Sequence, residues 1–244
     1  MRPIESSNPA FRNGAFSRAV AIPEEGVMTL GGTVFKSLVL VLVTAGFTLY
    51  TWQKIPLANV GPYVIGGAIG GFIVALITIF KPALAPWTAP IYAILEGIAL
   101  GGISAIYSSR YAGLPAQAVA LTFGVFIVML VLYATGIVRA TPMFRKVLLT
   151  AALALLGFYV LTFIVSFFGI QMPLVNSASP MGIAFSVVAC LIASFFLILD
   201  FVLISEGVQR QAPKRMEWYG AFTLLVSLVW IYLEMLRLLG KLRK

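Results

Sequence analysis

Residues 194–204 read SFFLILDFVLI, an apolar run with a single acid, Asp200, in its middle. Asp200 is the only aspartate in the 244-residue chain. Moving an ionised carboxylate to the centre of a membrane-spanning helix costs at least about 2.5 kcal/mol. The run therefore predicts a helix of a membrane protein, carrying an acid whose cost a partner or a function must offset.

The composition indicates an integral membrane protein. Hydrophobic residues make up 61% and charged residues 10% of the chain, against roughly 45–50% and about 25% in soluble domains. The formal net charge is +9, but the basic residues lie in short stretches between apolar runs and not in a cluster with exposed aromatic residues. They indicate membrane orientation, and we expect no nucleic-acid partner.

Seven stretches are long and apolar enough to span the lipid bilayer, which requires about 20 residues. We expect an all-α integral membrane fold, with a polar, disordered tail over residues 1–29 and a seven-helix transmembrane domain over residues 30–244. The predicted helices cover residues 30–52, 60–80, 87–107, 116–138, 147–168, 181–205 and 218–239.

The 17 basic residues are distributed unevenly between the two sides of the predicted helix bundle. With seven spans, most of them fall on the side of the N-terminus, so the positive-inside rule places the N-terminus in the cytoplasm. Four others, Arg237, Lys241, Arg243 and Lys244, lie at the C-terminal end. Either the last helix emerges on the opposite side with a basic tail, or it does not fully cross.

Two predicted spans carry pairs of glycines four positions apart. Such pairs let helix backbones approach closely in a membrane, where dispersion replaces the hydrophobic driving force between helices. We expect packing within the chain at these positions, with dimerisation as the less favoured alternative. They are Gly66, Gly67, Gly70 and Gly71 in the second span and Gly97 and Gly101 in the third.

Three acids fall well inside predicted spans: Glu96, Asp200 and Glu234. Because a lipid-facing surface must be apolar, we expect each of them in the bundle interior or along a wet cavity, as a candidate site residue. Arg237 lies three residues after Glu234 and could neutralise it in a structural salt bridge. Glu96 could hydrogen-bond a neighbouring helix as a neutral acid. Both structural alternatives stay open.

Asp200 has no cation within one helical turn of sequence on either side. If Asp200 shares a buried site with a second acid, the two are expected to share a proton. Such a pair would be a pH-sensitive latch, because deprotonation makes the two carboxylates repel each other. The same oxygens suit Ca²⁺, so we expect transient Ca²⁺ binding at Asp200 and Glu234.

The chain resembles the Bax inhibitor-1 (transmembrane BAX inhibitor motif, YccA-like) family in three stretches. LILDFVLI (197–204) and WIYLEMLRLLGKL (230–242) are similar to the last two helices of that family, where one acid ends L-x-L-Y-D and a second follows in L-Y-L-D. ILEGIALGGISAIY (94–107) is similar to the third-helix segment, with an acid ahead of a glycine-rich stretch.

The resemblance implies two layers of three helices around a central last helix, in a bacterial inner membrane. It also implies an ion pathway that a hydrogen-bonded acidic pair closes at low pH and through which Ca²⁺ leaks when the pathway is open. Asp200 matches the sixth-helix acid of the family and Glu234 the seventh-helix acid. Lys81 matches, by position, an arginine that helps to hold the closed state in some members.

The chain departs from the family pattern at its second acid. This acid is Glu234 and not an aspartate, and Arg237 stands where the family more often has an uncharged polar residue. With helix ends near residues 206 and 218 and a rise of about 1.5 Å per residue, Asp200 and Glu234 would not lie level. We therefore expect either a later start of the last helix or no direct contact between the two acids.

Two functions follow from these observations. The first is a pH-sensitive cation leak channel for Ca²⁺, with Asp200, Glu234 and Glu96 as pH-sensing residues. The second is a non-conducting regulator that binds a membrane protease or a stress-response partner, as the resemblance and the tail motif SSNPAF (6–11) suggest. We expect neither enzyme activity nor a cofactor, because the chain has no histidine and one cysteine, Cys190, so the usual ligands and catalytic groups are missing.

Overall fold

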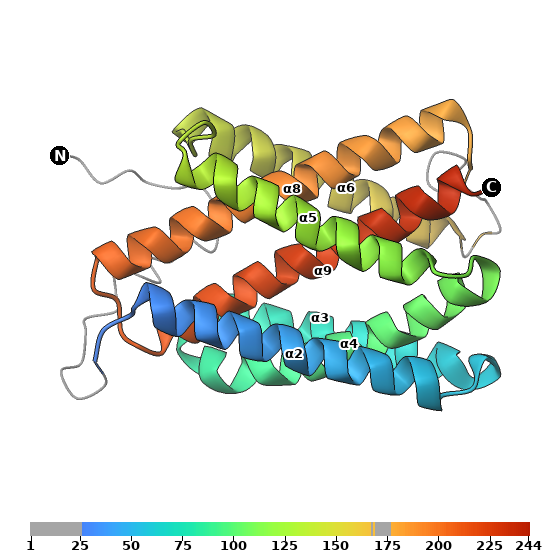
Figure 1. The fold of residues 1–244 in the computed structure, drawn as a ribbon, viewed down its shortest axis with the longest axis horizontal. Coiled ribbons are helices and arrows are strands. Elements are labelled where there is room, and N and C mark those ends of the chain that lie inside the picture. Colours follow the sequence, from blue (N-terminus) through green and yellow to red (C-terminus); the bar gives the residue numbers. More distant parts are fainter. Residues whose placement is uncertain (1–25, 167, 169–176) are drawn as a thin grey trace. The chain divides into compact units, whose positions relative to one another are not determined.

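The computed structural model describes residues 26–166, 168 and 177–244. Within these residues, seven helices are long and apolar enough to cross a membrane, which confirms the predicted seven-helix fold (Figure 1). β-structure in the described part is limited to one isolated bridge. The long helices are α2 (Leu30–Lys54), α3 (Val60–Phe80), α4 (Ala85–Arg110), α5 (Leu114–Ala134), α6 (Pro142–Ser166), α8 (Pro180–Gln209) and α9 (Met216–Leu242).

Local sequence signals set several helix ends. Thr141 and Ser179 cap α6 and α8, because the hydroxyl of each accepts a hydrogen bond from the amide three residues later, at 3.1 and 3.2 Å. A proline follows each cap, at a position where its missing N–H group costs nothing. α2 ends at Lys54 because Ile55 precedes a proline, which favours the extended backbone that Ile55 adopts.

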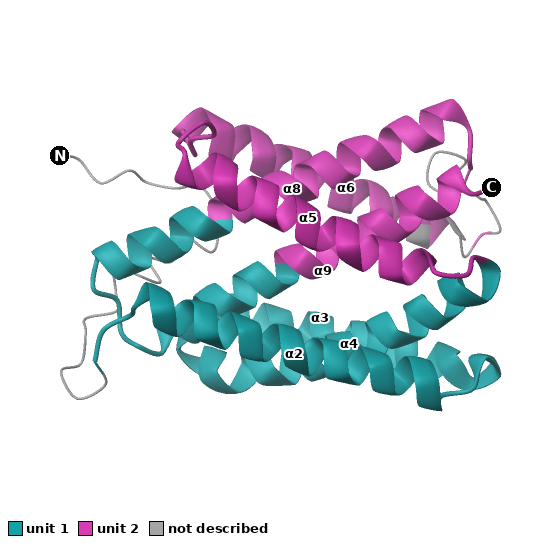
Figure 2. Cartoon of the chain, viewed as in Figure 1, with its two compact units in different colours: residues 1–110, 200–226 teal, residues 111–199, 227–244 magenta. Residues whose placement is uncertain are grey.

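The chain forms two compact units, and α8 and α9 contribute to both (Figure 2). Of the described residues, 26–110 and 200–226 form the first unit, and 111–166, 168, 177–199 and 227–244 form the second. α2, α3 and α4 therefore lie in the first unit, and α5 and α6 in the second. α8 and α9 each pass from one unit into the other partway along their length.

In the first unit, α4 packs closely against α2 through two glycines. A Cβ atom added to Gly97 or Gly101 would lie 2.6 or 2.5 Å from the carbonyl oxygen of Thr44 or Thr48 on α2. The hydroxyls of these two threonines in turn donate to the carbonyl oxygens of Ala93 and Gly97, at 3.2 and 3.1 Å. Absence of a side chain thus lets the two backbones approach until the threonine hydroxyls of α2 reach the carbonyl oxygens of α4.

α3 meets α4 in the same unit through a second set of glycines. A Cβ atom added to Gly67 would lie 2.6 Å from the carbonyl oxygen of Leu95, and one added to Gly71 would lie 2.9 Å from the carboxylate of Glu96. Gly66 differs from them, because nothing lies within 4 Å of an added Cβ atom there. A Cβ atom added to Gly70 would lie 3.3 Å from the side chain of Leu95, so the close approach depends on Gly67, Gly70 and Gly71 but not on Gly66.

Aromatic rings join the helices of the second unit. Edge-on or tilted ring pairs connect α6 to α8 and α8 to α9, an arrangement that complements the quadrupoles of the rings. The pairs are Phe158 with Phe185 at 5.2 Å between centroids, Phe144 with Phe195 at 5.7 Å, and Phe196 with Trp230 at 5.4 Å. This packing places α9 beside α8, with Trp230 one turn before Glu234.

Gly97→Ala is expected to lower the unfolding temperature, because the added methyl group would overlap the carbonyl of Thr44 and overpacking costs about 1–3 kcal/mol. Gly66→Ala is the matched control: its methyl group meets open space, and alanine favours the helix by up to about 1 kcal/mol. The measurement is thermal unfolding of the purified protein in detergent micelles. Equal unfolding temperatures for the two variants would contradict the close approach of α2 and α4.

Candidate functional site

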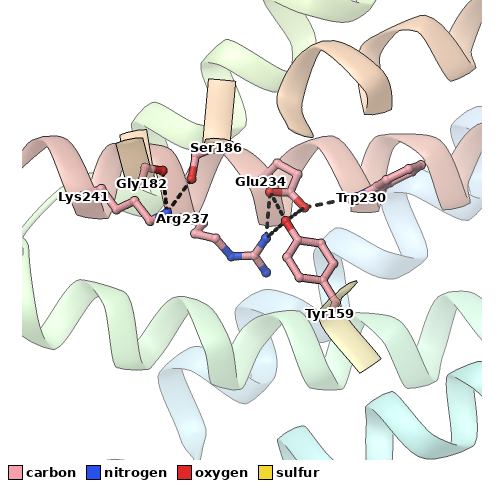
Figure 3. A network of polar contacts seen from close by, with 7 residues as sticks. All are labelled: Tyr159, Gly182, Ser186, Trp230, Glu234, Arg237 and Lys241. Carbon is pink, nitrogen blue, oxygen red and sulfur yellow. Dashed lines mark hydrogen bonds and ion pairs between the residues drawn. The ribbon is translucent and has the colours of Figure 1, made fainter. Parts of the chain in front are cut away.

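Glu234 on α9 is held by a network of donors in the second unit (Figure 3). Its side chain is 1% exposed. The hydroxyl of Tyr159 on α6 lies 2.9 and 3.2 Å from the two carboxylate oxygens, and the indole N–H of Trp230 donates at 3.2 Å. Arg237 donates to Oε2 at 2.7 Å. Three side chains from two helices thus surround one buried carboxylate.

Arg237 closes this network by bonding to both Glu234 and Tyr159. Its guanidinium donates to the hydroxyl of Tyr159 at 2.5 Å and lies 4.5 Å from the centroid of the Tyr159 ring. The Tyr159 hydroxyl therefore accepts from Arg237 while it donates to Glu234. The salt bridge that the spacing of Glu234 and Arg237 allowed is present, so the charge of this acid is balanced within α9 itself.

Lys241 continues the same face of α9 one turn further on. Its ammonium group is buried and donates to the carbonyl oxygen of Gly182 at 2.7 Å and to the hydroxyl of Ser186 at 2.8 Å, as Figure 3 shows. Both partners lie near the start of α8. Since α8 precedes α9 in the chain, this contact makes the two helices an antiparallel hairpin in the second unit.

Asp200 lies on α8 in the first unit and is 7% exposed. It is near enough to Tyr219 of α9 to interact electrostatically with its hydroxyl. In the same region Ile204 packs against Gly220, where an added Cβ atom would lie 3.0 Å from the isoleucine side chain. In an antiparallel pair, Asp200, one turn before Ile204, is therefore level with the part of α9 near Leu224.

The two acids thus have separate surroundings, in separate units. Glu234 is near enough to Cys190 of α8 for an electrostatic interaction within the second unit. The later start of the last helix, which the sequence allowed, is wrong, because α9 begins at Met216 and α8 continues to Gln209. Because Asp200 belongs to the first unit and Glu234 to the second, neither unit by itself contains a contact between them. A direct contact of the two acids in the closed state stays a prediction.

The remaining predicted site residues, Glu96 and Lys81, lie in the first unit. The carboxylate of Glu96 occupies the space left by Gly71 on α3, is partly buried, and accepts no hydrogen bond from any residue that the structure describes. Lys81 follows the last residue of α3 and is exposed. It forms no ion pair in the described part of the chain, and its role as a charge partner stays a prediction.

A third buried acid, Glu217, was not among the predicted site residues, because the predicted last helix began at residue 218 and left Glu217 in the connection before it. Because α9 begins at Met216, Glu217 falls in the first helical turn, and its side chain is 1% exposed. It forms an ion pair with Lys36 of α2. A signal was available, since acids are favoured in the first turn of a helix by its dipole, but the partner lies far away in sequence.

The described residues thus form seven helices of membrane-spanning length with bonded ionisable side chains buried among them, which defines an integral membrane protein. A family model described as Bax inhibitor 1 like matches residues 8–244, and the chain belongs to this family. The resemblance detected in its last two helices is thereby confirmed. A comparison with curated proteins found no match. The tail motif SSNPAF (6–11) lies outside the described residues.

Arg237→Met is expected to lower the free energy of unfolding by about 3 kcal/mol, because it leaves the buried carboxylate of Glu234 without its cation. Tyr159→Phe removes a hydrogen bond to a charged group but no charge, and is expected to cost about 1.5–3 kcal/mol. Both are measured by denaturant unfolding in micelles, followed by Trp fluorescence.

Arg210→Met is the matched control for Arg237→Met. Arg210 pairs with Glu206 at 3.5 Å, with side chains that are 54% and 31% exposed, and surface pairs of this kind contribute at most about 1 kcal/mol. If the two Arg→Met variants are equally stable, the network around Glu234 does not stabilise the second unit.

Proposed function

We propose that the protein is a pH-sensitive cation leak channel, with Ca²⁺ as its ion, in a bacterial inner membrane. One observation carries the proposal: Asp200 and Glu234, which are 7% and 1% exposed, lie in helices that are long and apolar enough to span a membrane. Ionisable residues in such places are costly and by default functional. Membership in the Bax inhibitor 1 like family supports the proposal.

The carboxylates of Asp200, Glu234 and Glu96 contribute to the ion pathway in this proposal. At low pH Asp200 and Glu234 share a proton in the closed state, and a neutral carboxyl group neither attracts nor binds a cation. At higher pH this pair loses its proton, the two carboxylates repel each other, and they offer hard oxygen ligands that suit Ca²⁺. Ca²⁺ passes as cargo: among the described residues, no three His, Cys, Asp or Glu side chains come together.

Arg237 adds a feature of its own to this mechanism. It donates to Glu234 at 2.7 Å, so a passing cation can bind this carboxylate only after the guanidinium has moved away. The Tyr159 hydroxyl, which contacts both side chains, holds the two together. We therefore assign Arg237 the role of a tethered cation that competes with the permeating ion and keeps the leak small.

The N-terminus lies in the cytoplasm in this proposal. The basic C-terminal end, which argued against that orientation, is bonded within the fold: Arg243 donates to the carbonyl oxygen of Ala112 at 3.0 Å and to Gln117 at 2.9 Å. Arg237 and Lys241 are bonded as well. These three cations therefore have structural partners that account for their place in the sequence, which supports a seventh crossing.

Ca²⁺ flux through purified protein in liposomes tests the proposal between pH 6 and pH 8. Wild-type flux is expected to rise with pH, because deprotonation opens the pathway. Asp200→Asn and Glu234→Gln remove one titrating group each and are expected to abolish this dependence. Glu206→Gln is the matched control, since Glu206 is a partly exposed acid near the end of α8, and it is expected to leave the pH profile unchanged.

Flux that ignores pH, or that keeps its pH dependence in both acid variants, would contradict the mechanism. Absence of flux in all variants, with thermal unfolding intact, would contradict the channel itself. That outcome would favour the second function, a non-conducting regulator of a membrane protease. Co-purification of a membrane protease with the full chain, but not with residues 26–244, would then support a role for the tail.

A further inference from the structure

A second buried ion pair, formed by Glu217 and Lys36, joins the first turn of α9 to α2 in the first unit. Their side chains are 1% and 14% exposed. We propose that Glu217 and Lys36 are positioning residues of the gate, which is the pair of acids Asp200 and Glu234. The contact of Glu217 with Lys36 and Thr29, called the clasp below, fixes the start of α9 and thereby the position of Glu234, further along the same helix. This inference rests on the proposed channel function.

The N-terminus of α2 supplies most of the clasp. Thr29, the N-cap residue of α2, donates its backbone amide and its hydroxyl to Oε1 of Glu217, both at 2.9 Å. Lys36, two turns later on the same face of α2, binds the other carboxylate oxygen. The negative charge therefore lies at the helix end whose unsatisfied N–H groups and dipole favour it.

A glycine makes room for this carboxylate. A Cβ atom added to Gly32 would overlap the carboxyl group of Glu217, so no other residue fits at this position without moving the acid. The ammonium group of Lys36 also lies 5.5 Å from the centroid of the Trp218 ring, where a cation–π contact is favourable. The clasp is thus built from side chains of both helices around one buried charge.

Backbone hydrogen bonds reinforce the same junction. The amide of Met28 donates to the carbonyl oxygen of Ala212 at 2.7 Å, and the amide of Lys214 donates to that of Gly26 at 3.1 Å. These bonds pair the segment before α2 with the connection between α8 and α9 as a short antiparallel bridge. Because Met28 and Ala212 are buried, water cannot easily replace either bond.

The junction bears on the gate because α9 is one continuous helix from Met216 to Leu242. At about 1.5 Å per residue, Glu234 lies roughly 25 Å along the helix axis from Glu217. A rotation or shift of the helix start is therefore carried to Glu234 and changes its position relative to Tyr159 of α6. A purely structural pair would stabilise the fold without influencing the surroundings of Glu234.

The single cysteine of the chain offers a reporter of those surroundings that does not depend on flux. Cys190 is buried beside Glu234 in the second unit and is the only thiol present. The experiment measures the labelling rate of Cys190 by a small maleimide, and Ca²⁺ flux from pH 6 to pH 8, in the full-length protein. Both are recorded below the unfolding temperature of every variant.

Lys36→Met and Glu217→Gln are the test variants, and Lys54→Met is the matched control. Glu217→Gln keeps an acceptor for Thr29 and removes only the ion pair, whereas Lys54 is an exposed lysine at the other end of α2. We expect both test variants to label Cys190 at least about threefold faster, and to raise flux at pH 6 towards its value at pH 8. Lys54→Met is expected to match the wild type in both measurements.

Unchanged labelling in both folded test variants would overturn the clasp as a positioning device. Faster labelling with an unchanged pH profile, in a wild type that conducts, would overturn its link to the gate. Faster labelling in a protein that conducts no Ca²⁺ would leave the clasp supported and contradict the channel function instead. The labelling rate therefore tests the positioning role of the clasp, and the Ca²⁺ flux tests the channel function on which this role rests.

Discussion

A polar group inside a bilayer must find its partner within the protein, because hydrocarbon offers it none. The buried charges of this chain follow this constraint closely. Glu234 is surrounded by Tyr159, Trp230 and Arg237, and Glu217 by Thr29 and Lys36. The same constraint shapes the helix contacts of the first unit, where glycines bring backbones close enough for threonine hydroxyls to bond across them.

Charge is distributed unequally along the chain, which gives Glu234 a particular importance. It is the only acid among residues 111–199 and 227–244, which form the second unit. These residues include several arginines and lysines, and Arg237, Lys241 and Arg243 are among those bonded within the fold. Glu234 is thus at once a candidate gating group and the counter-charge of the unit, so its removal leaves an uncompensated arginine. A structural and a functional role for this acid are therefore compatible.

α8 and α9 connect the chemistry of the two units because each helix contributes to both. α9 carries Glu217 in the first unit and Glu234 in the second, and α8 carries Asp200 in the first and Cys190 in the second. A continuous helix transmits displacement along its axis more readily than a loop does.

The sequence by itself determined the features that depend on local spacing. Apolar runs predicted seven spans, because span length follows from bilayer thickness. The pair Glu234 and Arg237 was visible too, because helical spacing alone brings residues three positions apart together. The resemblance to the family was legible in the acids of the last two helices and in the apolar residues around them.

Only the tertiary structure decided which residues, distant in sequence, bind the buried carboxylates. Tyr159 and Glu234 belong to different helices, and no periodic pattern connects them; the same holds for Lys36 and Glu217. The boundary of α9 had to be known before Glu217 could be recognised as a residue of a helix's first turn. The physical reason is that hydropathy indicates which segments enter the membrane, whereas the pairing of buried charges depends on how the helices pack against one another within it.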